Sequence, residues 1–187
     1  NVIYKSCLFL IAGNVEHRTN RLELDSLGGL AVTMPITFFA CLIASLSVSG
    51  IPPFNGFFSK WMIYQALIQG ISSPGEHFTM FLCLIIAMFA SALTLASFMK
   101  LLYAVFLAPP SNVIASPMEA PWQMWLPVLF LSFLCVLFGV FANSIPLKYF
   151  IYPIIADVSA QGFYAPVLTA VLILSGALLG LLIYFFS

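Results

Sequence analysis

The order of apolar and polar positions along the chain predicts a membrane protein made of helices. Uncharged and largely apolar stretches cover residues 26–59, 78–99, 120–147 and 158–187. Each of them is long enough to cross a bilayer once, because a spanning helix needs about 20 apolar residues. Together with an apolar segment over residues 1–13, they predict an all-α polytopic fold with about five membrane segments.

Polar residues and glycines indicate where the first helices end. The pair Gly13-Asn14 is typical of a helix C-terminus, so the first helix is expected to stop there and a polar loop to follow over residues 14–29. A third run of apolar residues, 77–108, is followed by a proline-rich loop. The next span is predicted over residues 124–143.

The last part of the chain divides into two further segments. Residues 145–164 are amphipathic and aromatic, so they are expected to lie at the membrane interface rather than to cross it. Residues 165–186 form the final apolar run. Gly176 and Gly180 in this run make a GxxxG pair, which permits close packing of helices.

The run from Ser49 to Gly56 interrupts the second apolar stretch. Pro52 and Pro53 remove two backbone donors, while Gly50 and Gly56 admit conformations that other residues avoid. An unbroken helix cannot pass through this sequence.

The segment over residues 33–70 is therefore expected to be discontinuous, in one of two arrangements. It forms either a hairpin of two short helices at a membrane face or one helix interrupted inside the membrane. We favour the interrupted helix, because neither half reaches spanning length alone and Lys60 follows the break by four residues. Broken helices inside a bilayer are tolerated where they line a water-filled cavity, and transporters bind ions at such places.

Composition excludes several classes of protein. Of the 187 residues, 63% are apolar and 6% are charged, whereas a soluble domain carries about a quarter charged residues. Six Lys and Arg balance six Asp and Glu, and no basic cluster is available to bind a nucleic acid backbone. Lipid is therefore the expected solvent, and soluble enzymes and nucleic-acid-binding proteins are excluded.

The cysteines give no indication of a metal centre in this chain. More than 30 residues separate each of Cys7, Cys41, Cys83 and Cys135 from the next, and each lies in an apolar run. Zinc and iron–sulfur sites need clustered thiolates.

Catalytic triads, paired carboxylates and phosphate-binding glycine loops are not apparent either. We therefore expect no metal and no cofactor in this chain, and no catalytic chemistry of its own.

Three lysines in apolar segments indicate proton transfer as the function. Lys5, Lys60 and Lys100 lie in otherwise apolar segments, where an ammonium group costs roughly 2.5–3.5 kcal/mol to insert. A lysine deprived of water loses proton affinity and can then accept and release a proton. Lys60 is the strongest candidate for proton translocation because it follows the break.

The other candidates for proton translocation have ordinary explanations as well. Lys5 and Lys100 could extend their ammonium groups to the membrane surface from helix ends. His17 and His77 occupy polar or helix-end positions. They suit solvated surface positions, with proton entry or exit as the alternative.

Four motifs resemble a known family. They read YKSCLFLIAG from Tyr4, EHRT from Glu16, LGGL from Leu27 and SGIPPFNGFFSK from Ser49. In combination they resemble the antiporter-like, proton-conducting membrane subunits. These subunits occur in respiratory complex I, in membrane-bound group 4 hydrogenases and in multisubunit Mrp cation/proton antiporters.

The resemblance implies a fold and roles for two lysines. Family members fold as inverted repeats, each with a discontinuous helix. Residues 1–108 would be the C-terminal part of the second repeat, and residues 109–187 the helices that follow it. Lys60 would be the lysine of the broken helix near an exit half-channel, and Lys5 would lie on a central polar axis. Asn1 stands where the family usually has histidine, so either a water molecule would bridge the proton path there or this member would couple differently.

The resemblance also implies a function and partners. We expect a proton- or sodium-translocating subunit of an energy-converting redox complex, as the C-terminal part of a longer chain in a prokaryotic cytoplasmic membrane. Its partners would be lipid, other membrane subunits and a peripheral module carrying iron–sulfur clusters with flavin or nickel–iron. The alternatives are an Mrp-type antiporter subunit without a redox partner, and a membrane scaffold that conducts nothing.

Overall fold

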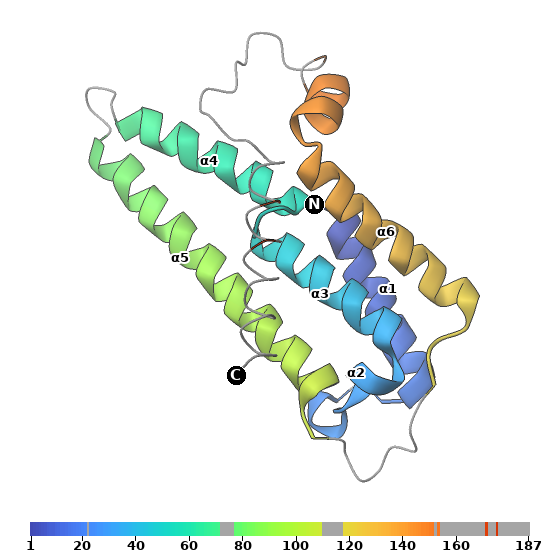
Figure 1. The fold of residues 1–187 in the computed structure, drawn as a ribbon. Coiled ribbons are helices and arrows are strands. Elements are labelled where there is room, and N and C mark those ends of the chain that lie inside the picture. Colours follow the sequence, from blue (N-terminus) through green and yellow to red (C-terminus); the bar gives the residue numbers. More distant parts are fainter. Residues whose placement is uncertain are drawn as a thin grey trace.

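The computed structural model describes residues 1–21, 23–71, 77–109 and 118–151, with the single residues 153, 171 and 175. In these parts of the chain every regular element is helical, which confirms the all-α prediction (Figure 1). Most of the expected interfacial segment, the final apolar run and the Gly176–Gly180 pair lie outside the described residues. The division at residues 108 and 109 stays a prediction.

Five long helices make up the described fold. They are α1 (Val2–Thr19), α3 (Pro35–Ser49), α4 (Asn55–Ile71), α5 (His77–Leu102) and α6 (Trp122–Val140). Shorter elements connect or extend them: η1 (Leu24–Ser26), α2 (Leu30–Thr33) and the π-helical turns η2 (Tyr103–Leu107) and η3 (Asn143–Ile151).

Helix α3 lies at the centre of this arrangement. It packs against α1 and α6 on one side and against α5 on the other, while α4 packs mainly against α5 and α6 (Figure 1). The core along α3 contains small side chains such as Cys7, Ala40, Cys41 and Ala44. Small residues let helices approach closely, which is how helices associate in lipid. Close packing around α3 therefore fixes the position of its C-terminal end.

The predicted end of the first helix at Gly13-Asn14 is wrong. Helix α1 continues to Thr19 and ends at Asn20, whose left-handed backbone (φ 51°) directs its N–H to the carbonyl of Glu16. Asn14 remains helical because its buried side chain has a partner on another helix, the Met124 carbonyl of α6 at 3.4 Å. A polar side chain is tolerated inside a packed helix when it is hydrogen-bonded.

The predicted bounds of the next-to-last span also shift. Helix α6 begins at Trp122 and ends at Val140, rather than covering residues 124–143. The helical turn η3 follows it and forms the first described part of the segment that we expected at the interface. Boundary errors of this size are common because helix ends depend on caps.

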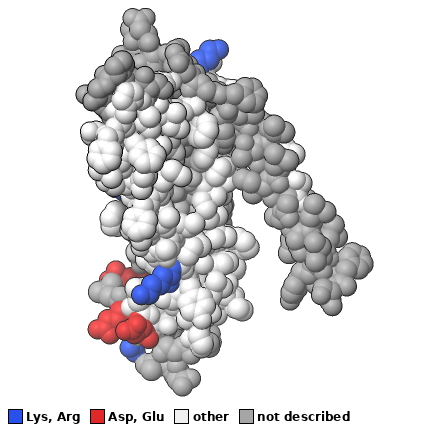
Figure 2. All heavy atoms as spheres, turned by 90° about the vertical axis from the view of Figure 1, so that its left-hand side faces the viewer, with Lys and Arg blue, Asp and Glu red and all other residues white. Residues whose placement is uncertain are grey.

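Two described helices have the length and hydropathy of membrane spans, the continuous unit His77–Leu107 and α6. Helix α3 is apolar but shorter, so the expected number of spans stays a prediction. On the face shown in Figure 2, acidic side chains gather at one end of the molecule and the described surface in the middle is uncharged. Such a surface suits an apolar solvent.

Glu119, from the segment before α6, holds the N-terminal end of α3. One of its carboxylate oxygens accepts the backbone N–H of Ile36 at 2.9 Å, and the other accepts the hydroxyl of Thr37 at 2.6 Å. Helix α3 has no capping side chain of its own. Arg18 of α1 donates to the backbone carbonyl of Glu119. The carboxylate therefore satisfies orphan donors and complements the helix dipole.

Replacing Glu119 with Ala should destabilise the protein by about 1–2 kcal/mol, which is the range for losing a helix cap. Thermal unfolding of the purified protein in detergent measures this loss. Glu23→Ala is the matched control, because Glu23 is exposed and surface changes away from such features stay within about 0.5 kcal/mol. Equal unfolding temperatures for the two variants would contradict the capping role.

Candidate functional site at the interrupted helix

The chain stops being helical between α3 and α4. Gly50 ends α3 in a left-handed conformation (φ 79°), and α4 starts at Asn55. The Pro52–Pro53 peptide bond in this interval is cis. Figure 1 shows α4 leading away from the end of α3 rather than folding back along it, which is the arrangement of an interrupted helix and not of a hairpin.

A polar cluster surrounds the end of α3. Ser45, Ser47 and Ser49 are all buried in the last turns of the helix. The hydroxyl of Ser47 donates to Oδ1 of Asn55, which joins the last turn of α3 to the first turn of α4. The hydroxyl of Ser49 donates back to the Ser45 carbonyl at 2.7 Å. The break is therefore polar and internally bonded, although the segments around it are apolar.

Lys60 places its ammonium group at the end of α3. Its Nζ donates to the backbone carbonyl of Ser49 at 2.8 Å. The side chain crosses directly over Gly50, where an added Cβ would lie 2.5 Å from Cδ and 3.3 Å from Nζ of Lys60. The C-terminus of a helix carries a partial negative charge, so it favours a cation at this point. Within the described residues no carboxylate pairs with Lys60.

Lys60 also lines a cavity between α4 and α5. The cavity has a volume of about 250 Å³, and its polar lining consists of Lys60, Tyr64, Ser91 and Thr94. The Tyr64 hydroxyl and the Ser91 hydroxyl lie 2.6 Å apart. Lys60 thus bonds to a helix-end carbonyl and also lines a cavity that contains hydroxyl groups.

The structure does not bring the other predicted candidates to this site. Lys5, Lys100, His17 and His77 are all exposed in the described fold. Lys5 is exposed, whereas its neighbour Tyr4 is buried, with its ring 3.6 Å from the position of a Cβ on Gly56. The ring of His77 bonds instead to the Ile71 carbonyl at the end of α4.

Two glycines let neighbouring backbones approach the break. A Cβ on Gly56 would overlap the Ser47 carbonyl. A Cβ on Gly139 of α6 would overlap the Pro53 carbonyl and lie 2.5 Å from the carbonyl carbon of Phe54. Glycine permits this close approach because it has no side chain.

Sequence reasoning identified the break and Lys60 but missed three residues around them. Gly139, Ser91 and Thr94 were not candidates. The spacing of Ser91 and Thr94, one turn apart on a largely apolar helix, is the signal that could have indicated a polar face.

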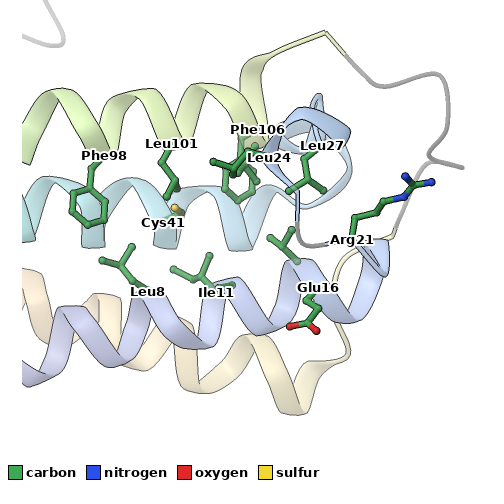
Figure 3. A pocket seen from close by; sticks show the side chains of 13 residues that line it. Leu8, Ile11, Glu16, Arg21, Leu24, Leu27, Cys41, Phe98, Leu101 and Phe106 are labelled. Carbon is green, nitrogen blue, oxygen red and sulfur yellow. The ribbon is translucent and has the colours of Figure 1, made fainter.

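A second cavity differs from the one at Lys60. It measures about 210 Å³ and lies between α1, α3 and the α5–η2 unit (Figure 3). Leu8, Leu101 and Phe106 are among its apolar walls, whereas the charged ends of Glu16 and Arg21 point away from it in Figure 3. Its lining is mainly apolar and contains no lysine. Lys60 lines the cavity between α4 and α5, and we take that cavity as the candidate site.

A packed set of apolar helices, with one helix interrupted at a buried polar cluster and a lysine at the break, defines a polytopic membrane protein of the ion-transporter type. The model of the family "NADH:quinone oxidoreductase/Mrp antiporter, TM" matches residues 2–94. The chain belongs to this family of antiporter-like membrane subunits, and the resemblance given by its sequence motifs is confirmed.

Relatives from antiporters and from hydrogenases are similar to the chain. It is 33% identical to a Na(+)/H(+) antiporter subunit of Alkalihalophilus pseudofirmus, over 75% of this chain and 18% of that protein. It is also 33% identical to "Formate hydrogenlyase subunit 3" of Escherichia coli, over 75% of this chain and 24% of that protein. The chain therefore spans a quarter or less of the length of these two relatives.

A solved structure shares the fold over nearly the whole chain. It is that of the membrane-bound sulfane sulfur reductase, an archaeal respiratory membrane complex, with a TM-score of 0.81 and 29% identity. The match covers 99% of this chain and 31% of that one. The structure of the Mrp complex from Dietzia sp. matches with a TM-score of 0.64 at 24% identity and shows the fold alone.

Proposed function

We propose that the chain is part of an ion-translocating membrane subunit in which Lys60 carries the proton. The observation that supports this role is the position of Lys60, whose ammonium lies 2.8 Å from the last carbonyl of α3 and whose side chain lines a cavity that contains hydroxyl groups. The carbonyl favours the charged amine, and waters in the cavity would accept its proton. The amine therefore has a partner in each protonation state.

Charge changes in a neighbouring part of the assembly would drive the cycle. A positive charge approaching Lys60 disfavours its ammonium form, and removal of that charge restores it. Lys5 on α1 is the proposed relay toward Lys60, with Lys100, His17 and His77 as secondary candidates for proton entry or exit. A proton path between Lys5 and Lys60 needs further proton-carrying groups, which the described residues do not supply.

For the assembly, we propose an energy-converting redox complex in a prokaryotic cytoplasmic membrane. Membrane subunits would be the direct neighbours, and a peripheral module would carry iron–sulfur clusters with flavin or nickel–iron. The second candidate is an Mrp-type antiporter, which is favoured by the similarity to a Na(+)/H(+) antiporter protein. Native mass spectrometry of the extracted complex separates the two, because only the first would contain subunits with redox centres.

The experiment on function is the replacement Lys60→Ala in the full-length chain of the assembled complex. We expect proton movement into everted membrane vesicles, followed by a fluorescent pH probe, to fall about tenfold or more, since a positioned proton carrier contributes at least that much. Lys148→Ala is the matched control, because Lys148 is exposed and lies beyond the break. Wild-type translocation by Lys60→Ala would support the non-conducting scaffold instead.

A further inference from the structure

The cavity beside Lys60 contains a hydrogen-bonded pair of hydroxyl groups to which the proposed function assigns no role. Tyr64 lies one turn after Lys60 on α4, and Ser91 faces it from α5 with an oxygen–oxygen distance of 2.6 Å. Thr94 adds a third hydroxyl one turn further along α5. The rest of the lining consists of Ile63, Ala87 and Ala90, so the polar side chains of the cavity come from Lys60, Tyr64, Ser91 and Thr94.

A neighbouring hydrogen bond determines which hydroxyl is the donor in the Tyr64–Ser91 pair. Ser91 has one hydroxyl hydrogen, and its oxygen donates to the Ala87 carbonyl at 3.0 Å. A serine hydroxyl donates once and accepts through its lone pairs. Tyr64 is therefore the donor in its bond to Ser91. The hydroxyl proton of Tyr64 already points from the Lys60 side of the cavity toward α5.

The volume of the cavity allows water to complete the connection. A water molecule occupies about 30 Å³ in the liquid and needs two to four polar partners. The cavity of about 250 Å³ has room for several waters. Lys60, Tyr64 and Thr94 offer them donors and acceptors around its polar side.

We propose that Tyr64 and Ser91 form a hydroxyl relay that moves the proton between Lys60 and the α5 side of the cleft. The Lys60 ammonium releases one proton through water to the Tyr64 oxygen, while Tyr64 passes its own hydroxyl proton to Ser91. Ser91 turns its hydroxyl from the Ala87 carbonyl to a water in the cavity and releases that proton to it, and rotation of both hydroxyls then resets the pair. Both hydroxyls end neutral, Lys60 is left as the amine, and one proton has moved.

The relay rests on the proposed role of Lys60, and its test keeps the two separate. The variants Tyr64→Phe and Ser91→Ala each remove one hydroxyl with little change in shape. In everted vesicles containing the assembled complex, each should lower proton translocation about tenfold, within the range for a positioned proton-transfer group. The double variant should be no slower than the single ones, because either change interrupts the same path.

Matched variants distinguish a relay from packing. Ser91→Thr keeps the hydroxyl and should retain translocation, whereas a packing role would tolerate alanine better than the larger threonine. Tyr103→Phe removes an exposed tyrosine hydroxyl on η2 and should leave translocation unchanged. The amount of assembled complex in the vesicles, measured by gel, normalises every rate.

Each result has one reading. A loss in Tyr64→Phe and Ser91→Ala beyond that of Tyr103→Phe, restored in Ser91→Thr, supports the relay. Losses no greater than in Tyr103→Phe overturn it, as does a loss in Ser91→Thr equal to that in Ser91→Ala. If Lys60→Ala blocks translocation while Tyr64→Phe does not, the relay alone fails. If Lys60→Ala translocates normally, the proposed function fails.

Discussion

Lys60→Arg should abolish ion translocation although it preserves the positive charge at the end of α3. A guanidinium group holds its proton much more tightly than an amine does, so it stays charged at pH 7. It can still donate to the Ser49 carbonyl, which Lys60 contacts at 2.8 Å. Arginine thus keeps the contact and removes the ability to release a proton.

This variant separates a carrier from a fixed charge. A carrier role predicts a loss of about 100-fold or more, as expected when an essential proton-transfer group cannot titrate. The loss should exceed that of Lys60→Ala, because water can partly replace a missing side chain but cannot pass a permanent cation. The rate of acidification in everted vesicles measures this, with Lys148→Arg as the matched control.

The opposite outcome would be equally clear. Translocation by Lys60→Arg at the wild-type rate, with assembled complex present in equal amount, would show that Lys60 is a structural cation. The break would then be a packing feature stabilised by a charge at a helix end. The relay through Tyr64 would lose its proton donor in the same experiment.

The break and its lysine could be predicted from the sequence because their determinants are local. Pro52 and Pro53 cannot continue a helix, and Gly50 supplies the left-handed residue at its end. Lys60 follows within a short stretch of the same chain. No distant residue is needed to place the interruption, and the structure has α3 ending at Ser49 and α4 beginning at Asn55.

The errors and omissions arise where the end or the cap of a helix depends on residues far away in the sequence. Asn14 indicates a helix end by its local preference, but a carbonyl 110 positions along the chain satisfies its side chain and α1 continues. The same holds for Glu119, which caps a helix from 83 positions away. Local preferences are weak compared with tertiary hydrogen bonds in a packed interior.

The candidate site was predicted only in part for the same reason. Lys60 was identified from a local pattern, but its contact with the Ser49 carbonyl depends on how the chain turns at Gly50. Ser91 is 27 positions from Tyr64, so their pairing requires the antiparallel packing of α4 and α5. Side chains that meet across helices follow from packing, which hydropathy does not specify.

Gly139 on α6 is expected to be among the residues of the described fold least tolerant of substitution. Its alanine variant would place a methyl group 2.5 Å from the carbonyl carbon of Phe54 and 2.7 Å from the backbone nitrogen of Asn55. These are backbone atoms next to two prolines, so no flexible side chain can move aside. Helix α6 or the break itself must shift by about 1 Å to restore a normal contact.

Gly139→Ala should therefore reduce stability and translocation together. Overpacking of a closed interface costs about 1–3 kcal/mol, and the rigid neighbours place this case at the upper end. The displaced break would also move the Ser49 carbonyl away from Lys60. The temperature at which the complex unfolds in detergent and the rate of acidification in vesicles should both fall. Gly13→Ala is the matched control, since a Cβ there meets nothing within 4 Å and alanine favours a helix by about 0.5–1 kcal/mol. If both variants unfold and translocate alike, α6 does not hold the interrupted helix in place.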